Sequence, residues 1–240
     1  MLLCIDCGNS RLKWGLHDGQ RWLKQAALAL AELDRLKQEF SGLPLPSAVI
    51  ACSVAGEQAR LAVERPVAAL GLPLTWLVSQ PAQCGVTNSY TTPAQLGADR
   101  WAAMIGARYL FPGDCLVVNA GTATTIDVLD NNGVFQGGLI LPGIDLMRAS
   151  LAGNTAQLPL VDGACQPLPR NTADAIASGA LLATAGAIAC MFAHVAASPG
   201  ATCLVTGGAA ALLLPVLQVP WRAAEHLVLE GLLRVAAEGA

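Results

Sequence analysis

Charged residues are scarce in this chain, and neither sign is in large excess. Only 13% of the 240 residues are Asp, Glu, Lys or Arg, and the formal net charge is −3. Proteins that bind the phosphate backbone of nucleic acids need a basic surface, so nucleic acid is not an expected partner. Apolar residues make up 54% of the chain, which is enough to bury a large core and argues against global disorder.

Targeting and metal-binding signals are also missing. The start of the chain, MLLCID, has no basic segment, so no secretory signal is visible. We therefore expect a cytoplasmic protein whose eight cysteines are reduced thiols. Cys4 and Cys7 form a C-x-x-C, but residues three apart in a strand point to opposite faces, and no second pair or His lies nearby. This disfavours a metal or redox site.

One long segment, 175–197, contains no charged residue, and its length would admit a membrane span. It is rich in Ala, Gly, Ser and Thr, has few Leu and Ile, and includes His194. This content favours a buried or subunit-facing helix, so no membrane is expected as a partner.

Although G-x-G-x-x-G after a strand and G-x-x-x-x-G-K-[ST] are both absent, another pattern occurs twice. The segments 3–10 (LCIDCGNS) and 117–124 (VVNAGTAT) each contain an apolar run, an acid or its amide, a Gly two positions later, and small polar residues. Each continues into a second strand-like run and a tight-turn dipeptide, Asp18-Gly19 or Asn132-Gly133. The duplication predicts two similar lobes that face a shared cleft.

The remaining pattern predicts an α/β fold with a mixed sheet in each lobe. We place the lobes at 1–112 and 113–240, divided at Phe111-Pro112-Gly113. Strands are predicted at 2–7, 12–16, 21–26, 47–54, 74–78, 115–119, 124–129, 134–141 and 201–206. Helices are predicted at 27–40, 58–70 with a kink or break at Pro66, 98–110, after Gly143, 171–197, after Gly208 and 223–238, and 79–92 is predicted as a loop.

The two repeated turns are candidate phosphate loops, because a Gly lets the backbone approach a ligand and neighbouring N–H groups and hydroxyls can donate to it. Asp6 would suit a divalent cation that bridges nucleotide phosphates. Either turn alone is more simply an ordinary turn, but the pair favours phosphate binding. Asp99 and Arg100 begin a predicted helix, where Asp99 could also be an N-cap or first-turn acid.

The duplicated loop resembles the phosphate loops of the actin, Hsp70 and sugar-kinase superfamily, and the chain resembles type III pantothenate kinases in particular. The motifs that carry the resemblance are 6–10 with Lys13, 97–100, 121–127, 137–143, 155–159, Asn171-Thr172 and 206–208. They occur in order along nearly the whole chain. The resemblance implies two actin-like (ribonuclease H-like) lobes, each a mixed sheet with helices, and an ATP cleft between them.

The resemblance also implies residue roles. Asp99 would be the base that accepts the proton of the substrate hydroxyl. The implied ATP-binding residues are Asp6, Cys7, Gly8, Asn9, Ser10, Arg11, Leu12, Lys13 and Thr122, with Asp6 organising Mg²⁺. The implied pantothenate-binding residues are Tyr90, Gly97, Ala98, Asp99, Arg100 and Thr172. For Tyr90 a packing role is the alternative, and for Gly207-Gly208, expected near the nucleoside, a plain turn.

One position departs from the family pattern. Asn119 stands where the family has an Asp associated with a monovalent cation, K⁺ or NH₄⁺. An amide offers a carbonyl oxygen but no charge, so we expect cation binding to weaken.

The resemblance implies a homodimeric cytoplasmic kinase that transfers phosphate from ATP to pantothenate, the first step of coenzyme A synthesis. Segment 175–197 would then be a dimer surface. Two alternatives stay open at this point. One is a kinase of the same superfamily that acts on another small hydroxyl acceptor, and the other is a non-catalytic regulator that keeps the fold.

Overall fold

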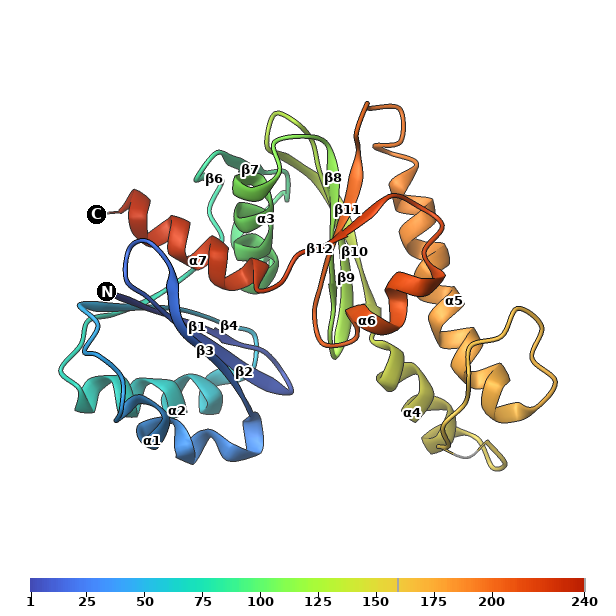
Figure 1. The fold of residues 1–240 in the computed structure, drawn as a ribbon, viewed down its shortest axis with the longest axis horizontal. Helices are drawn as coiled ribbons and strands as arrows, with labels where there is room; N and C mark the ends of the chain where they lie inside the picture. Colours follow the sequence, from blue (N-terminus) through green and yellow to red (C-terminus); the bar gives the residue numbers. More distant parts are fainter. Residues whose placement is uncertain (159, 240) are drawn as a thin grey trace. The chain divides into compact units, whose positions relative to one another are not determined.

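The computed structural model describes residues 1–158 and 160–239, and these form two compact units (Figure 1). The first unit contains Met1–Leu110 and the segment that begins at Leu227, and the second contains Phe111–His226. The division therefore differs from the expected lobes 1–112 and 113–240, because the C-terminal helix α7 (Leu227–Glu238) packs in the first unit.

The first unit is built on a five-stranded mixed sheet. Its strands lie in the order β3 (Trp22–Ala29), β2 (Arg11–His17), β1 (Leu2–Cys7), β4 (Ala48–Ser53) and β5 (Leu74–Trp76). β1 and β2 are antiparallel, whereas β4 lies parallel to β1. Leu3, Ile5 and Cys7 alternate along β1 and enter a core with α1 (Leu36–Phe40) and α2 (Gly56–Ala69). Residues of β1 between these three face the opposite side of the sheet.

Helices α3 (Ala98–Leu110) and α7 cover that opposite side and lie side by side (Figure 1). The crossing depends on two glycines, Gly106 and Gly231. A Cβ added at Gly231 would overlap the carbonyl of Ala102, and one added at Gly106 would overlap the carbonyl of Leu227. The helices therefore approach backbone to backbone, a contact that a helical sequence pattern does not reveal.

Several predicted elements of the first unit need correction. The helix predicted over 27–40 starts later, because β3 pairs with β2 as far as Ala29 and is followed by the 3₁₀ turn η1 (Leu30–Arg35) before α1. Pro66 does not break α2, which continues from Gly56 to Ala69. The predicted loop 79–92 contains a small hairpin, β6 (Ala82–Gln83) and β7 (Val86–Asn88), and the 3₁₀ turn η2 (Pro93–Gln95) precedes α3.

The second unit has its own mixed sheet, with strands in the order β12 (Trp221–Ala223), β11 (Thr202–Thr206), β8 (Cys115–Ala120), β9 (Ala123–Leu129) and β10 (Val134–Pro142). Helix α5 (Thr172–Phe192) packs on this sheet through Ile188 and Phe192. The other helical elements are α4 (Ile144–Asn154), α6 (Ala210–Leu213) and η3 (Leu214–Val216).

Two predicted helices, one in each unit, were too long. α5 ends at Phe192 rather than Ala197, and the helix predicted from Ala223 begins at Leu227, because Trp221–Ala223 forms β12. By length and composition α5 could cross a membrane. Its Ile188 face is buried in the core of the unit, as in the core helix of a soluble protein.

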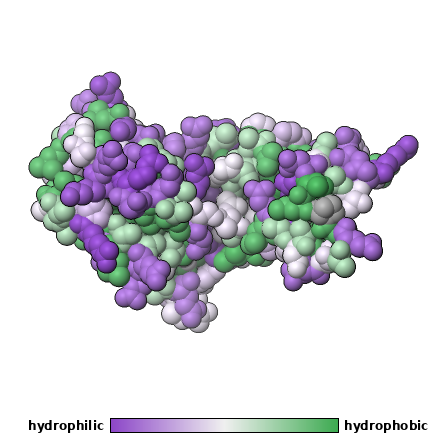
Figure 2. Space-filling view, turned by 90° about the horizontal axis from the view of Figure 1, so that it is seen from below, coloured by the Kyte–Doolittle hydropathy of each residue, from purple (hydrophilic) through white to green (hydrophobic). Residues whose placement is uncertain are grey.

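Apolar side chains are exposed around α4 and the segment that follows it, which form a green area on the surface of the second unit (Figure 2). Leu146, Leu151 and Leu160 are 48%, 38% and 62% exposed, respectively. Helix α4, which carries part of this apolar surface, packs against α5.

The predicted duplication is confirmed by the strand pairing. In each unit an antiparallel pair, β1–β2 or β8–β9, has a parallel strand, β4 or β11, beside its first member. Asp6 thus lies between Lys13 and Cys52, and Asn119 holds the equivalent place between Thr125 and Thr206. The acid and the amide are structural counterparts.

Candidate active site

Asp6 lies near the C-terminal end of β1, on the face covered by α3 and α7, and is only 8% exposed. The thiol of Cys52, its neighbour on β4, donates a hydrogen bond to Asp6 Oδ1 at 3.6 Å. Lys13 stands opposite Asp6 on β2. The carboxylate is therefore held between a cation and a weak donor.

Burial raises the pKa of Asp6 to about 6. The charge of Lys13 and the Cys52 hydrogen bond lower this pKa, whereas the charge of Asp99 raises it. Asp6 and Asp99 are therefore close enough to repel each other. A bound divalent cation would offset that repulsion, and Mg²⁺ typically takes one or two carboxylates together with phosphate oxygens. Asp6 fits such a role.

Asp99 lies in the first turn of α3, with its carboxylate folded back toward the start of the helix. Its Oδ1 accepts a hydrogen bond from the Arg100 N–H at 2.8 Å. A Cβ added at Gly97 would lie only 2.7 Å from that oxygen, so the Gly makes this orientation possible. Burial raises the pKa of Asp99, and the Arg100 N–H and charge work against this rise. The result is a more basic carboxylate at a fixed place.

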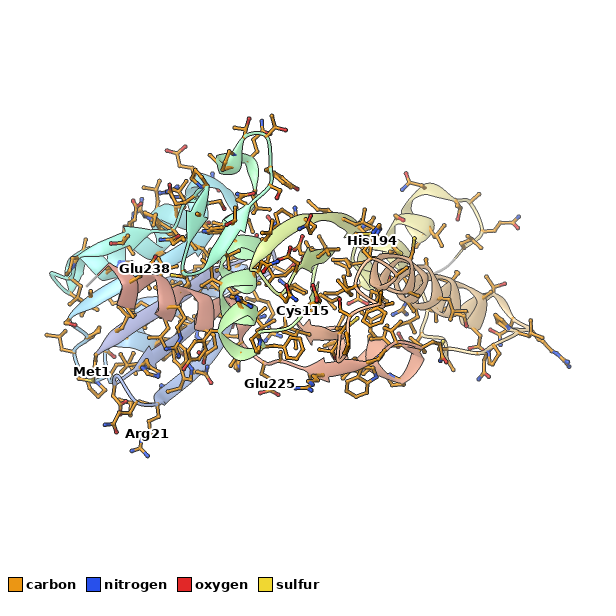
Figure 3. All side chains as sticks on the ribbon, turned by 90° about the horizontal axis from the view of Figure 1, so that it is seen from above. Met1, Arg21, Cys115, His194, Glu225 and Glu238 are labelled. Atoms are coloured by element: carbon orange, nitrogen blue, oxygen red, sulfur yellow. The ribbon has the colours of Figure 1, made fainter. Side chains whose placement is uncertain are left out.

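Arg100 and Tyr90 form a pair within the first unit. Arg100 is 4% exposed, and its Nη1 donates to the Tyr90 hydroxyl at 2.9 Å. The Tyr90 N–H in turn donates to Asn88 Oδ1 at the end of β7. The hairpin before Tyr90 is fixed by Glu238, on the last turn of α7 (Figure 3), which accepts from the Cys84 N–H at 3.0 Å.

The first loop offers mostly backbone groups and polar side chains. Gly8 N–H donates to the Arg11 carbonyl, which closes the turn, while Asn9 and Ser10 are exposed. Cys7 and Leu12 are fully buried in the core of the unit. Of these two predicted ATP-binding residues, only the backbone is available to a nucleotide.

The second loop, around Gly121 and Thr122, is held by two glycines. The Gly143 N–H donates to the Thr122 carbonyl at 2.9 Å, and a Cβ added at Gly143 would meet the Gly121 and Thr122 carbonyls. Gly207 has a φ of +101°, and a Cβ there would overlap the carbonyl of Ala120. Gly207 is therefore required by close approach to the loop, beyond the needs of a plain turn.

The direct strand neighbours of Asn119 are neutral. These are Thr125 and Thr206, which carry hydroxyls and are buried. The buried carboxylate of Asp127 lies two residues beyond Thr125, on the same face of β9. Across residues 1–158 and 160–239, three or more His, Cys, Asp or Glu side chains nowhere gather in a way that could hold a metal ion by themselves. Asn119 and its direct neighbours offer a monovalent cation neutral oxygens.

Thr172 is placed in the second unit, apart in sequence from Asp99, Arg100 and Tyr90 of the first unit. It is the first residue of α5, just after the N-cap Asn171, whose side chain accepts from the Asp174 N–H at 2.9 Å. Thr172 is exposed and lines a cavity of about 730 Å³ between α4 and α5.

The sequence of the chain matches known proteins along its whole length. Residues 2–194 match the family model for type III pantothenate kinases. A type III pantothenate kinase from Aromatoleum aromaticum is 50% identical over 240 residues, covering 100% of this chain and 99% of that protein. The chain belongs to the type III pantothenate kinase family. The match to the family model includes both phosphate loops, Asp99 and Thr172, whereas Gly207-Gly208 lie beyond it.

Solved structures support the fold of this type III pantothenate kinase family member. A conserved Baf family protein from Campylobacter jejuni superposes with a TM-score of 0.64 at 22% identity, covering 99% of this chain and 98% of that one. An activator of 2-hydroxyisocaproyl-CoA dehydratase from Clostridium difficile, solved with bound ADPNP, gives 0.54 at 12% identity, covering 99% and 93%. The two units are actin-like lobes.

Sequence reasoning missed Cys52, the residue of this pantothenate kinase family member that contacts Asp6. Cys52 lies in an apolar strand with no motif of its own, and only the parallel pairing of β1 with β4 brings it to Asp6. Thr206 and Thr125 were noted as parts of motifs, but their place on either side of Asn119 also depends on strand pairing. The sequence repeat could have revealed these neighbours if the comparison of the two halves had included the parallel strand of each unit, β4 and β11.

Proposed function

We propose that this protein is an ATP-dependent kinase that phosphorylates the primary hydroxyl of pantothenate, giving 4′-phosphopantothenate at the first step of coenzyme A biosynthesis. The observation that carries the proposal is the 50% identity over the full chain to a type III pantothenate kinase. The first unit also supports the proposal, because it contains two buried carboxylates with different partners. Asp6 lies beside Lys13 and Cys52, and Asp99 lies beside Arg100.

In this proposal Asp99 accepts the proton of the substrate hydroxyl. The hydroxyl oxygen bonds to the γ-phosphorus of ATP, the bond to the β–γ bridging oxygen breaks, and ADP leaves. Asp6 would hold Mg²⁺, which would neutralise charge on the phosphates. Such transfer depends mostly on positioning and charge stabilisation, so the raised pKa of Asp99 helps without being decisive.

In this proposal the two repeated loops bind the phosphate groups of ATP. Gly8, Asn9, Ser10 and Lys13 of the first loop and Thr122 of the second donate hydrogen bonds or positive charge to them. The remaining members of the first loop, Cys7, Arg11 and Leu12, contribute through the backbone or at its edge. Tyr90, Gly97, Ala98, Arg100 and Thr172 bind the acceptor, with Tyr90 also orienting Arg100.

A coupled assay with ATP, Mg²⁺ and pantothenate tests the function. Wild-type protein should release ADP with pantothenate and give far lower kcat/KM with other small hydroxyl acceptors, such as sugars and polyols. Asp99→Asn should lose roughly 100-fold or more in kcat, the scale of general-base catalysis, while ATP binding measured by calorimetry survives. If Asp99→Asn retains wild-type turnover, Asp99 is not the base. If wild type is inactive with pantothenate but binds ATP, the regulator is the better reading.

We also propose, from Asn119, that this protein is active without a tightly bound K⁺ or NH₄⁺. Asn119 and its direct neighbours Thr125 and Thr206 are uncharged, so none of the three supplies the carboxylate expected of a cation ligand. Activity should change little when K⁺ is replaced by a bulky organic cation such as tetramethylammonium. Asn119→Asp should make the rate depend on K⁺. A wild-type enzyme that stops without K⁺ would contradict this.

The proposal also includes a cytoplasmic homodimer. Seven exposed residues follow one side of α5 and carry no charge: Ala175, Gly179, Leu182, Ala183, Gly186, Ala189 and Cys190. Small residues spaced along one side of a helix allow close approach of another helix. This supports a dimer surface as the reason why so apolar a helix stays half exposed.

A further inference from the structure

The cavity between α4 and α5 has an apolar wall. Met147 and Leu151 of α4, Ile176 of α5 and Leu158 line it. Its volume of about 730 Å³ lies in the range of small-molecule sites. A ligand with an aliphatic body would fit this wall, and the cavity also contains the hydroxyl of Thr172.

The wall is fixed by hydrogen bonds from the segment that joins the two helices. Arg148 Nη2 of α4 donates to the Val161 carbonyl at 2.8 Å. The Ala164 N–H donates to Asp174 Oδ1 of α5 at 2.8 Å, and the Gln166 N–H donates to Ser178 Oγ at 2.9 Å. The segment before α5 is therefore anchored to both helices at Val161, Ala164 and Gln166. Arg170 follows these anchors, just before α5.

Arg170 is the charged member of the cavity lining, and its side chain is exposed. Within residues 1–158 and 160–239 no hydrogen bond or ion pair of Arg170 is found. The acids in the surrounding segments have other partners. Asp174 accepts from Ala164 and Asn171, while Asp145 and Asp162 pair with Arg148. The cavity therefore presents an uncompensated guanidinium beside an apolar wall.

We propose that Arg170 binds the carboxylate of the acceptor, and so makes the enzyme select an acid over a neutral alcohol. This rests on the proposed function. Pantothenate has a primary hydroxyl at one end, two methyl groups beside it and a carboxylate at the other end. Arg100 is almost fully buried and already donates to Tyr90, whereas Arg170 is exposed and unpaired next to Thr172. A guanidinium binds a carboxylate with two parallel hydrogen bonds, which suits recognition of an acid.

The test compares two acceptors that differ only in the group at that end. In pantothenol a hydroxymethyl group replaces the carboxylate of pantothenate. Wild type should prefer pantothenate in kcat/KM. Arg170→Met should lose roughly 10- to 100-fold with pantothenate, the scale of hydrogen bonds to a charged group, with most of the change in KM. Its kcat/KM with pantothenol should stay near that of wild type, so the preference collapses.

Two variants sharpen the result. Arg222→Met removes an exposed arginine of the same unit that does not line this cavity, and it should leave the preference unchanged. Arg170→Lys keeps the charge but not the paired donors, so it should recover part of the preference.

Three outcomes would overturn the inference. If Arg170→Met lowers kcat/KM equally for both acceptors, the residue acts on folding or on the whole site. If it lowers neither, Arg170 does not touch the acceptor. A wild-type protein that phosphorylates neither acceptor overturns the proposed function and this inference with it, and is distinguished from the other two by the absence of any turnover.

Discussion

The buried carboxylate of Asp6 lowers the stability of the unliganded protein at neutral pH. Its pKa is about 6 in the folded state, above the ordinary 3.8, and burial is the main cause. Between these two values the folded state binds more protons than the unfolded state, so the contribution of Asp6 to stability falls as pH rises through 6. Above that pH the folded protein carries a buried charge that Lys13 compensates only in part.

Asp6→Asn should therefore stabilise the unliganded protein at pH 7.5, by on the order of 1 kcal/mol for each unit of raised pKa. The gain should shrink as pH falls below 6 and vanish only well below pH 3.8, where the wild-type carboxylate is protonated in both states. Urea unfolding at several pH values measures it. Asp18→Asn is the matched control, because backbone N–H groups lower the pKa of Asp18 and no gain is expected. A destabilised Asp6→Asn at pH 7.5 would contradict the expectation.

Cys52 should matter through Asp6 rather than through packing. Its thiol is the side-chain donor to Asp6 Oδ1, and orienting groups behind a metal ligand typically change metal affinity 10- to 100-fold when removed. Cys52→Ala should raise the Mg²⁺ concentration needed for half-maximal nucleotide binding by roughly 10-fold, whereas Cys52→Ser, which keeps a donor, should not. Calorimetric titration with ADP and Mg²⁺ distinguishes the two. Equal effects of Ala and Ser would show a packing role only.

At the scale of elements, the crossing of α3 and α7 is the tightest contact of the first unit. Gly231→Ala would place a methyl group against the Ala102 carbonyl, so the helices must separate. We expect a loss of about 1–3 kcal/mol, the usual range for an overpacked core. Gly153→Ala in α4 is the control, since a Cβ there meets nothing within 4 Å and should be neutral or stabilising. Thermal unfolding of both variants checks the difference.

Elements with a strong local pattern were predictable from the sequence. β1 at Leu2–Cys7 and α3 at Ala98–Leu110 have the predicted bounds. The signals that define them are local: an apolar run in β1, and Phe111-Pro112 directly after the end of α3. β3 was predicted too short, because its last residues, up to Ala29, are held by pairing with β2 rather than by their own pattern. The secondary-structure preference of a segment therefore sets its bounds only where pairing with a neighbouring strand does not override that preference.

The candidate site was predictable as far as its motifs reached. Asp6 was found from the repeated loop and Asp99 from the resemblance to type III pantothenate kinases, and the structure brings their charges together. The contact of Cys52 with Asp6, and the packing of α7 on the first unit, join residues far apart in sequence. No local pattern encodes such pairs, so the residues that support Asp6 appeared only with the fold.

At the scale of the whole molecule, the exposed side of α5 should control self-association. Leu182→Glu puts a charge in the middle of that uncharged surface and should convert the proposed dimer to a monomer, as seen by light scattering. Leu182 is 46% exposed, so the fold should tolerate the change. Leu61→Glu on α2, where the leucine is 42% exposed, is the control and should leave the mass unchanged. A wild-type monomer at micromolar concentration would refute the dimer itself.

The return of α7 to the first unit has a consequence for the order in which the protein is made. Residues 111–226 form a contiguous unit that can fold on the ribosome once they have emerged, whereas the first unit waits for residues 227–238, which are synthesised after the whole of the second unit. The strand that bears Asp6 is therefore translated long before α7, which covers it. The acid that would hold the metal stays without its cover until the second unit has been synthesised, which delays any binding of nucleotide to the nascent chain.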